Sequence, residues 1–333
     1  MSRFALVLPL VFSFFAINCS RSSGVDTLTI YSSMDESLTQ KLTQAFKEET
    51  GVHVEFVRLS TGEAAARIEA EKSNPQASLW LGGVGLGHGE IKAKGLSTPY
   101  ESPAAKKIGK DFRDPENYWT GIYTGVLVLV SNQDQLKKKN LSAPSSWKAL
   151  TEPQWKGQIQ LPNPATSGTS YNLITALVRA QGEEKAFDYL KALHQNVSQY
   201  TKSGAAPTKN VALGESIVAV GYQHDSVRLA EESKAPLVIT YPSEGTGFEI
   251  APISMLKNGK TPELGKRFFD WVFSPKASQI LADFYYVPLL REGVKIQEKA
   301  LPPKDLKLID VPVDWAGENK QRLLDLWNLK INT

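Results

Sequence analysis

The sequence predicts an α/β protein with two domains, and two observations lead to that prediction. Segments with the two-residue period of strands alternate with segments that carry the period of amphipathic helices, as in proteins whose helices cover a central sheet. The chain has 333 residues, whereas a single domain usually has about 100–200. We therefore expect two α/β domains, without an internal repeat or a low-complexity tract.

Local signals place the individual elements along the chain. Residues 35–50 carry their apolar side chains on one helical face and stop at Gly51, a residue typical of helix C-termini. Ser60 and Glu63 form a capping box at the start of the next helix. The apolar run 126–130 predicts a buried strand that is long enough to pass from one domain to the other. In chain order, the expected strands are 28–31, 52–56, 79–81, 126–130, 217–220, 237–240 and 249–253, and the expected helices are 35–50, 60–71, 169–181, 183–194, 262–273, 275–286 and 316–329.

The N-terminus has the pattern of a secretory leader. Arg3 precedes 13 uncharged residues, 4–16, and the only cysteine of the chain, Cys19, follows closely. The pattern predicts a signal peptide at 1–18 and a lipid-modified Cys19 that begins a short polar linker, 19–26. A signal peptide with an incidental cysteine is the alternative. With either interpretation the mature chain works outside the cytoplasm, as a membrane-anchored protein if Cys19 carries lipid.

Composition excludes several classes of function. Arg3 is the one charged residue in the leader, so the net charge falls from +3 to +2 in the mature chain, and these charges are spread along the sequence. A nucleic-acid-binding protein would usually show a basic stripe instead. A single cysteine allows no disulfide and no cysteine-based metal site. After Cys19, no apolar run approaches the roughly 20 residues that cross a bilayer.

Small hydroxyl residues and glycines stand before predicted helices in both halves of the chain. The unpaired N–H groups and partial positive charge at a helix start favour anions, and glycine lets a ligand approach the backbone. Each group taken alone also suits an ordinary helix cap. Because the pattern recurs, it favours a phosphate or carboxylate site made of Ser32, Ser33, Ser60, Thr61, Gly62, Ser167, Gly168, Thr169 and Ser203.

Catalytic and metal-binding motifs are missing from the sequence. The alternating glycines of 83–89 surround His88 but do not match a dinucleotide-binding loop, so we expect a flexible turn there. The four histidines lack metal-ligand spacing. His224 and Asp225 follow the strand 217–220, at the strand end where open α/β sheets bind ligands; a solvated turn is the alternative. The sequence therefore predicts a binding protein without a cofactor or resident metal, and not an enzyme.

Several strings resemble the solute-binding proteins of ABC importers. They are Tyr31-Ser32-Ser33, LWLGG (79–83), YWTGIYTG (118–125), WKAL (147–150), QWKGQI (154–159), NPATSGTSY (163–171), YTKSGAAPTK (200–209), GYQHD (221–225) and SEGTGFEI (243–250). The resemblance covers nearly all of the mature chain and is closest to the ferric-ion-binding cluster of the type II periplasmic binding fold, within it the branch that binds hexose phosphates.

The resemblance implies two lobes around a ligand cleft. It assigns 27–125 with 241–274 to one lobe and 126–240 with 275–333 to the other, with hinges near 124–132 and 238–247. The helix starts at Ser167, Gly168 and Thr169 and at Ser203 would hold an anion, and Gly82 and Gly83 would lie in the cleft. His224, Asp225 and Glu244 would contact sugar hydroxyls, which suits the hydrogen-bonding capacity of these side chains.

Iron ligation is not supported by the positions that the resemblance aligns. Ferric-ion binders carry two adjacent tyrosines where this chain has Gln223 and His224, and Ser32 and Ser33 stand where those proteins have a histidine. The pair Tyr285 and Tyr286 is expected in a C-terminal helix, where it does not substitute.

We therefore expect a monomeric, lipid-anchored binding protein that presents a small phosphorylated ligand, a hexose phosphate, to an ABC permease. A receptor for ferric or other metal ions, a pyridoxal phosphate or phosphonate binder, and a phosphatase that uses His224 and Asp225 are the alternatives.

Overall fold

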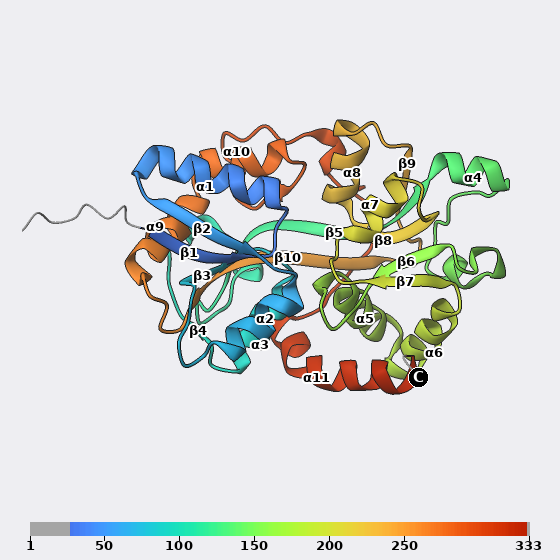
Figure 1. The fold of residues 1–333 in the computed structure, drawn as a ribbon, viewed down its shortest axis with the longest axis horizontal. Helices are drawn as coiled ribbons and strands as arrows, with labels where there is room; N and C mark the ends of the chain where they lie inside the picture. Colours follow the sequence, from blue (N-terminus) through green and yellow to red (C-terminus); the bar gives the residue numbers. More distant parts are fainter. Residues whose placement is uncertain (1–26, 332–333) are drawn as a thin grey trace, which may run out of the picture.

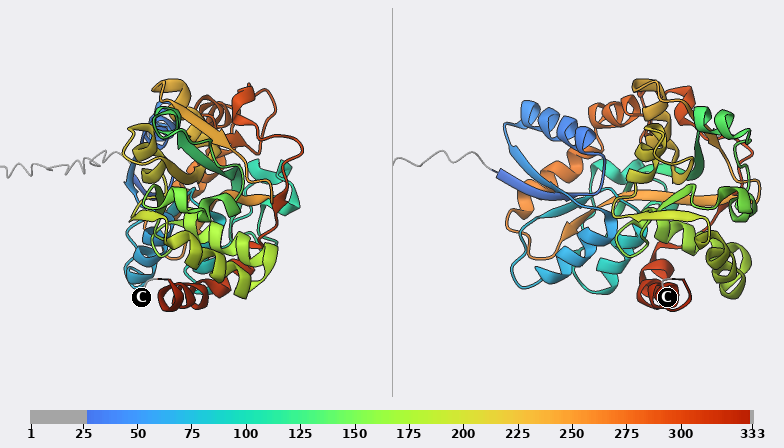
Figure 2. Two further views of the ribbon diagram at one scale, coloured as in Figure 1. Left: turned by 90° about the vertical axis from the view of Figure 1, so that its right-hand side faces the viewer. Right: turned by 45° about the vertical axis from the view of Figure 1, so that its right-hand side comes forward.

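The computed structural model describes residues 27–331, so the predictions about the leader and Cys19 lie outside the described residues. A single path of paired strands runs in the order β2-β1-β3-β10-β5-β8-β6-β7. Helices lie on both sides of these strands (Figures 1 and 2). The strands are β1 (Thr27–Ser32), β2 (His53–Arg58), β3 (Leu79–Leu81), β4 (Ser97–Thr98), β5 (Thr120–Asn132), β6 (Ile159–Pro162), β7 (Val197–Thr201), β8 (Val218–Tyr222), β9 (Leu237–Thr240), β10 (Thr246–Leu256), β11 (Val287–Pro288) and β12 (Leu308–Ile309).

The helices follow the signals in the sequence. They are α1 (Glu36–Thr50), α2 (Thr61–Ala70), α3 (Gly85–Ala93), α4 (Gln133–Lys139), α5 (Gly168–Gln181), α6 (Glu183–His194), α7 (Ala206–Ala212), α8 (Gln223–Glu232), α9 (Pro262–Val272), α10 (Pro275–Asp283) and α11 (Val313–Lys330). Gly51 ends α1 in the left-handed conformation, with φ 75°. The Glu63 carboxylate accepts a hydrogen bond from the backbone N–H of Ser60 at 3.0 Å, as a capping box requires.

Two long strands join the two halves of the sheet. In each half the short strands are parallel, β2-β1-β3 in the first and β7-β6-β8 in the second. Between them β5 and β10 run antiparallel to each other and pair with both halves, so they cross from one lobe to the other (Figure 1). The architecture is thus the expected two-lobe α/β fold, with β5 and β10 as connecting strands.

Each lobe has its own hydrophobic core. The first core combines α1 with α9 and α10, including Phe46 and Phe268, whose rings meet edge to face at 5.0 Å. The second core surrounds Trp155 and Phe187 and includes Leu323 of α11. The expected division put residues 275–333 in the second lobe, whereas α10 packs in the first core. The sequence reveals the apolar face of α10 but not its packing partner.

The glycine-rich stretch 83–89 differs from the expected flexible turn, because most of it forms α3. A Cβ on Gly89 would lie 2.6 Å from the backbone oxygen of Val313, and one on Gly317 of α11 would lie 2.6 Å from the carbonyl carbon of Gly89. These glycines therefore allow α3 and α11 to approach closely. Within residues 27–331, no helix is both long and apolar enough to cross a membrane.

His88 is buried within this glycine-rich helix. Its ring stacks on Trp80 with centroids 4.0 Å apart, Nε2 donates to the carbonyl of Gly82 at 3.0 Å, and Nδ1 lies 2.7 Å from the Ser254 hydroxyl. This arrangement satisfies the neutral imidazole, and burial lowers the pKa of His88 to about 3. His88 is consequently a structural residue that holds the turn at Gly82.

Acid unfolding should depend on His88. The unfolded chain binds a proton there below about pH 6.5, whereas the folded protein does so only near pH 3, so stability is lost as the pH falls through this window. His88→Gln, which stays uncharged, should flatten the decline of the urea midpoint between pH 7 and pH 4.5. His53→Gln, on the outer strand β2, is the control. Parallel pH profiles for His88→Gln and the wild type would contradict this assignment.

Candidate functional site

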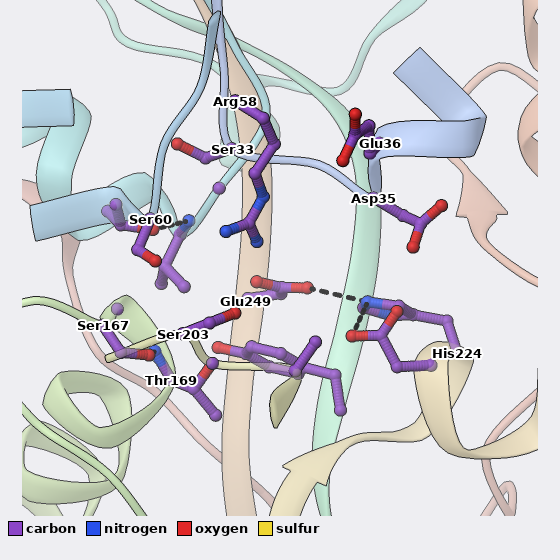
Figure 3. Close-up of a pocket in the computed structure, with 18 of the residues that line it drawn as sticks. Ser33, Asp35, Glu36, Arg58, Ser60, Ser167, Thr169, Ser203, His224 and Glu249 are labelled. Carbon is purple, nitrogen blue, oxygen red and sulfur yellow. Dashed lines mark hydrogen bonds and ion pairs between the residues drawn. The ribbon is translucent and has the colours of Figure 1, made fainter. Parts of the chain in front are cut away.

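A cavity of about 220 Å³ lies between the lobes. It opens beside β5 and β10, where α1 and α2 of the first lobe face α5 and α8 of the second (Figure 3). Its wall is formed by Ser33, Asp35, Glu36, Arg58, Ser60, Thr61, Gly83, Val84, Tyr123, Ser167, Gly168, Thr169, Ser203, Gly204, Ala205, Lys209, Tyr222, His224, Asp225, Glu249 and Tyr286.

One end of the cavity is rich in hydrogen-bond donors. Helix α5 begins there, and its cap Ser167 accepts a hydrogen bond from the N–H of Thr169. Gly204 packs so closely that a Cβ would lie 2.4 Å from the Thr169 hydroxyl oxygen, which brings the backbone of both segments to the cavity. Helix-start N–H groups and hydroxyls at this density suit an anion.

Arg58 adds a positive charge to the donor-rich end. It ends β2, its Nε donates to the carbonyl of Met34 at 3.3 Å, and its guanidinium points into the cavity (Figure 3). Within residues 27–331 Arg58 forms no ion pair, so its charge is available to a ligand. Lys209 of α7 supplies a second cationic side chain to the wall.

The opposite end gathers carboxyl groups around a histidine. His224 and Asp225 lie in the first turn of α8, directly after β8, and Glu249 lies on β10. The Nε2 atom of His224 is 3.9 Å from both Asp225 Oδ2 and Glu249 Oε1 (Figure 3). The imidazole stacks between Tyr222 and Tyr286, with ring centroids 5.4 and 4.1 Å away.

Burial favours the neutral forms of His224 and Glu249. It lowers the pKa of His224, and it raises the pKa of Glu249 well above its ordinary value, aided by the negative charge of Asp225. His224 Nδ1 and Glu249 Oε1 are buried and have no hydrogen-bond partner within the part of the chain that the structure describes. Both residues line the cavity, and in their neutral forms both side chains can donate and accept hydrogen bonds, which suits a ligand hydroxyl.

Most of the sequence-predicted residues converge on this cavity. Those in its wall are Ser33, Ser60, Thr61, Gly83, Ser167, Gly168, Thr169, Ser203, His224 and Asp225. Ser32 is instead buried below the cavity and bonds Thr39, and Gly82 packs against Met34 with its carbonyl on His88. Both support the turns that carry wall residues.

Glu244 is not among the residues that form the cavity wall. Its carboxylate accepts the backbone N–H groups of Trp147 and Lys148, each at 3.1 Å, so it is committed to a structural turn of the second lobe. Glu249, five residues further on, lies in the cavity wall instead. The sequence string contains both carboxylates, but Glu244 lies in the turn before β10, whereas Glu249 lies within the strand.

Sequence analysis missed several wall residues. Arg58 carried a usable signal, because it ends a strand where open α/β sheets bind ligands. Tyr286 was expected in a helix, but α10 ends at Asp283 and Tyr285 adopts φ 65°, which turns Tyr286 into the wall. Gln223, aligned with a tyrosine of ferric-ion binders, donates to the carbonyl of Lys299 and is absent from the wall. The other unexpected wall residues are Asp35, Glu36, Val84, Tyr123, Gly204, Ala205, Lys209 and Tyr222.

Gly62 serves the contact between the lobes and is not part of the cavity wall. Its N–H donates to the carbonyl of Thr166 in the second lobe at 2.9 Å. A Cβ there would lie 2.2 Å from the carbonyl oxygen of Ala165. The start of α2 can therefore touch the second lobe only because residue 62 has no side chain.

Within residues 27–331, no group of three or more His, Cys, Asp or Glu side chains is arranged to hold a metal ion. The three tyrosines of the wall, Tyr123, Tyr222 and Tyr286, carry the oxygen that ferric ion prefers. Burial raises the pKa of all three hydroxyls well above their ordinary value, which opposes the phenolate form.

Known proteins resemble this chain along most of its length. Residues 88–312 match the family described as bacterial extracellular solute-binding protein. An uncharacterized protein of Haemophilus influenzae is 36% identical over 310 residues, which cover 90% of this chain and 89% of that protein. The periplasmic binding protein AfuA of Actinobacillus pleuropneumoniae, solved with fructose-6-phosphate bound, is 35% identical with a TM-score of 0.88, covering 92% of this chain and 99% of AfuA. The ferric binding protein of Campylobacter jejuni shares the fold, with 23% identity, a TM-score of 0.77, and coverage of 91% and 98%.

Replacing Gly62 by alanine should keep the lobes from reaching the contact seen here. The new Cβ needs a separation of about 3.5–4.0 Å from the backbone atoms of the second lobe. The contact between the lobes must therefore open locally by on the order of 1 Å. A crystal structure of Gly62→Ala should show the displaced lobes. Gly109→Ala, whose Cβ would meet only ordinary contacts at 3.5 Å, is the control. An unchanged Gly62 to Thr166 hydrogen bond in the variant would refute this role.

Proposed function

This chain belongs to the family of bacterial extracellular solute-binding proteins that serve ABC transporters in the periplasm, and from that premise we propose that it is a lipid-anchored receptor for a hexose phosphate. The observation that carries the ligand proposal is the division of the cavity into two chemical ends. The hydroxyl residues Ser60, Ser167, Thr169 and Ser203 lie on one side of the cavity and His224 on the other, and the side chains of Arg58 and Glu249 lie between them (Figure 3). A molecule with an anionic group at one end and hydroxyls at the other matches both.

The size of the cavity supports a small ligand. Its volume of about 220 Å³ is below the roughly 300–1,000 Å³ of pockets for drug-sized molecules. A single phosphorylated sugar suits this space better than a nucleotide or an oligosaccharide. The solved relative that holds fructose-6-phosphate, at 35% identity, supports the same ligand class.

In the proposed complex, the start of α5 and Arg58 hold the phosphate. Ser167, Gly168 and Thr169 would supply backbone N–H groups and hydroxyls, and the guanidinium would pair with phosphate oxygens. At the other end, neutral His224 and Glu249 would exchange hydrogen bonds with sugar hydroxyls, while Asp225 accepts from them. Glu249 takes the role that the sequence had given to Glu244.

Two alternatives are less well supported. A ferric-ion receptor would need phenolates from Tyr123, Tyr222 and Tyr286, whose burial opposes deprotonation. An aminophosphonate would place an ammonium group among the carboxyl groups, but burial favours the protonated form of Glu249 and Asp35 is already paired with Arg228. Neutral hydroxyls therefore fit this end better than a second charge.

Mutations at the two ends should have different effects. Thr169→Val removes a donor from the phosphate end, where a charge-assisted bond contributes roughly 1.5–3 kcal/mol, so it should weaken both fructose-6-phosphate and inorganic phosphate. Asp225→Ala removes an acceptor that only the hydroxyl-bearing part of the ligand can use, so it should spare inorganic phosphate while reducing discrimination among sugar phosphates.

Titration calorimetry with fructose-6-phosphate, fructose and inorganic phosphate tests these roles. Thr151→Val, on the surface of the second lobe, is the control for Thr169→Val. Proportional losses for every ligand in both variants would show that the assigned roles are wrong. Tight binding of unphosphorylated fructose would exclude a phosphate receptor altogether.

Membrane attachment should depend on Cys19, the only cysteine of the chain. Cys19→Ala should move the protein from the membrane fraction to the soluble fraction without altering ligand affinity, because the described cavity lies within residues 27–331. Fractionation with a radiolabelled fatty acid, compared with Ser20→Ala, measures this. If Cys19→Ala stayed at the membrane and still incorporated lipid, the lipoprotein proposal would fail.

A further inference from the structure

An ion pair beside the cavity connects the two lobes. Arg228 of α8, in the second lobe, places Nη2 2.7 Å from Oδ2 of Asp35, at the start of α1 in the first lobe. Both side chains are largely buried, 12% and 11% exposed. Lys202 and Glu63 form another contact between the lobes at 2.6 Å, but Lys202 is 76% exposed, and exposed pairs contribute little.

A contact with an aromatic ring, in addition to the ion pair, holds the Arg228 guanidinium against the first lobe. Its Cζ atom lies over the Phe284 ring, 5.8 Å from the centroid, and Phe284 follows α10 of the first core. Nη1 is 3.5 Å from Glu232 on its own helix, while Nε is buried and has no partner in residues 27–331. A cation held this way across two lobes would lose most of these contacts when the lobes separate.

Asp35 has two oxygens with two separate partners. Oδ1 accepts the N–H groups of Ser37 and Leu38 and so caps α1, while Oδ2 receives Arg228. Asp35 also lies in the cavity wall, as does Asp225, one turn before Arg228 on α8. The negative charge of Asp225 and that of Asp35 both raise the pKa of Arg228, although burial lowers it. Arg228 thus places a positive charge close to the carboxylates at the end of the cavity that contains His224 and Asp225, which we call the hydroxyl-binding end.

We propose that Arg228 is a positioning residue that holds the two lobes closed over the ligand by pairing with Asp35 and that offsets the carboxylates behind the hydroxyl-binding end of the cavity. The inference rests on the proposed function in so far as it concerns a bound sugar phosphate. Arg228 itself is not in the cavity wall, so it acts through Asp35 and Asp225.

Arg228→Met and Asp35→Asn, alone and combined, test the proposal. Methionine keeps an apolar stem beside Phe284, and asparagine removes the charge of Asp35 but still caps a helix well. Each single variant should release fructose-6-phosphate about tenfold faster with little change in the association rate, and the double variant should be no worse than either single one. Arg322→Met breaks the Arg322 to Glu183 pair within the second lobe, 2.6 Å long, and is the matched control.

X-ray scattering of the ligand-free proteins separates this inference from the ligand proposal. Arg228→Met should have a larger radius of gyration than wild type and Arg322→Met, whatever the ligand proves to be. If wild type binds no sugar phosphate but the scattering difference appears, the proposed ligand fails and the closing pair stands. Additive effects of the two substitutions on release, or identical radii of gyration for all variants, would overturn the role of Arg228.

Discussion

The antiparallel pairing of β5 with β10 is the constraint on which the rest of the structure depends. Both strands continue into both halves of the sheet, so one ladder fixes each lobe relative to the other. The same register places Glu249 opposite Gly125, where a Cβ would lie 2.8 Å from Glu249 Oε1 and 3.0 Å from His224 Nδ1. A shift of one residue would turn Glu249 to the other face of the sheet. The same strand pairing therefore both connects the lobes and positions Glu249 at the hydroxyl-binding end of the cavity.

The charges in the wall make the two ends of the cavity differ in their preference for an anion. A second ionised carboxylate beside Asp225 would be buried at high cost, and burial together with the charge of Asp225 raises the pKa of Glu249, which favours its protonated form. The donor-rich end has no such conflict, because Arg58 and the start of α5 both favour negative charge. An anionic group placed at the wrong end would face Asp225 instead of these donors. The protein charges would thus orient the proposed sugar phosphate before any detailed fit is considered.

Much of the fold could be predicted from sequence because it follows local rules. The predictions that failed did so for physical reasons. Capping at Ser60 and at Ser167 depends on neighbouring residues alone, and so does the helix end at Gly51. The glycines of 83–89 were mistaken for a turn, because their close contact with α11 comes from a segment more than 200 residues away. Glu244 could be distinguished from Glu249 only by its contacts with the backbone of Trp147 and Lys148, which come from a distant part of the chain. Sequence patterns report what a residue can do locally, and tertiary contacts decide which use is made of it.

The two helix starts that meet between the lobes explain why an anion would favour closure. Helix α2 begins beside the second lobe, where Gly62 bonds Thr166, and helix α5 begins beside the first, where a Cβ on Gly168 would lie 2.7 Å from the Thr61 hydroxyl oxygen. Each helix start carries partial positive charge, so bringing them together costs energy unless negative charge lies nearby. A phosphate in the donor-rich end would supply that charge, whereas a neutral sugar would not. On the other side of the cavity, Arg228 and Asp35 bring opposite charges together. Closure then depends on two contacts. The approach of the α2 and α5 helix starts needs the negative charge of the ligand, whereas the ion pair of Arg228 with Asp35 does not.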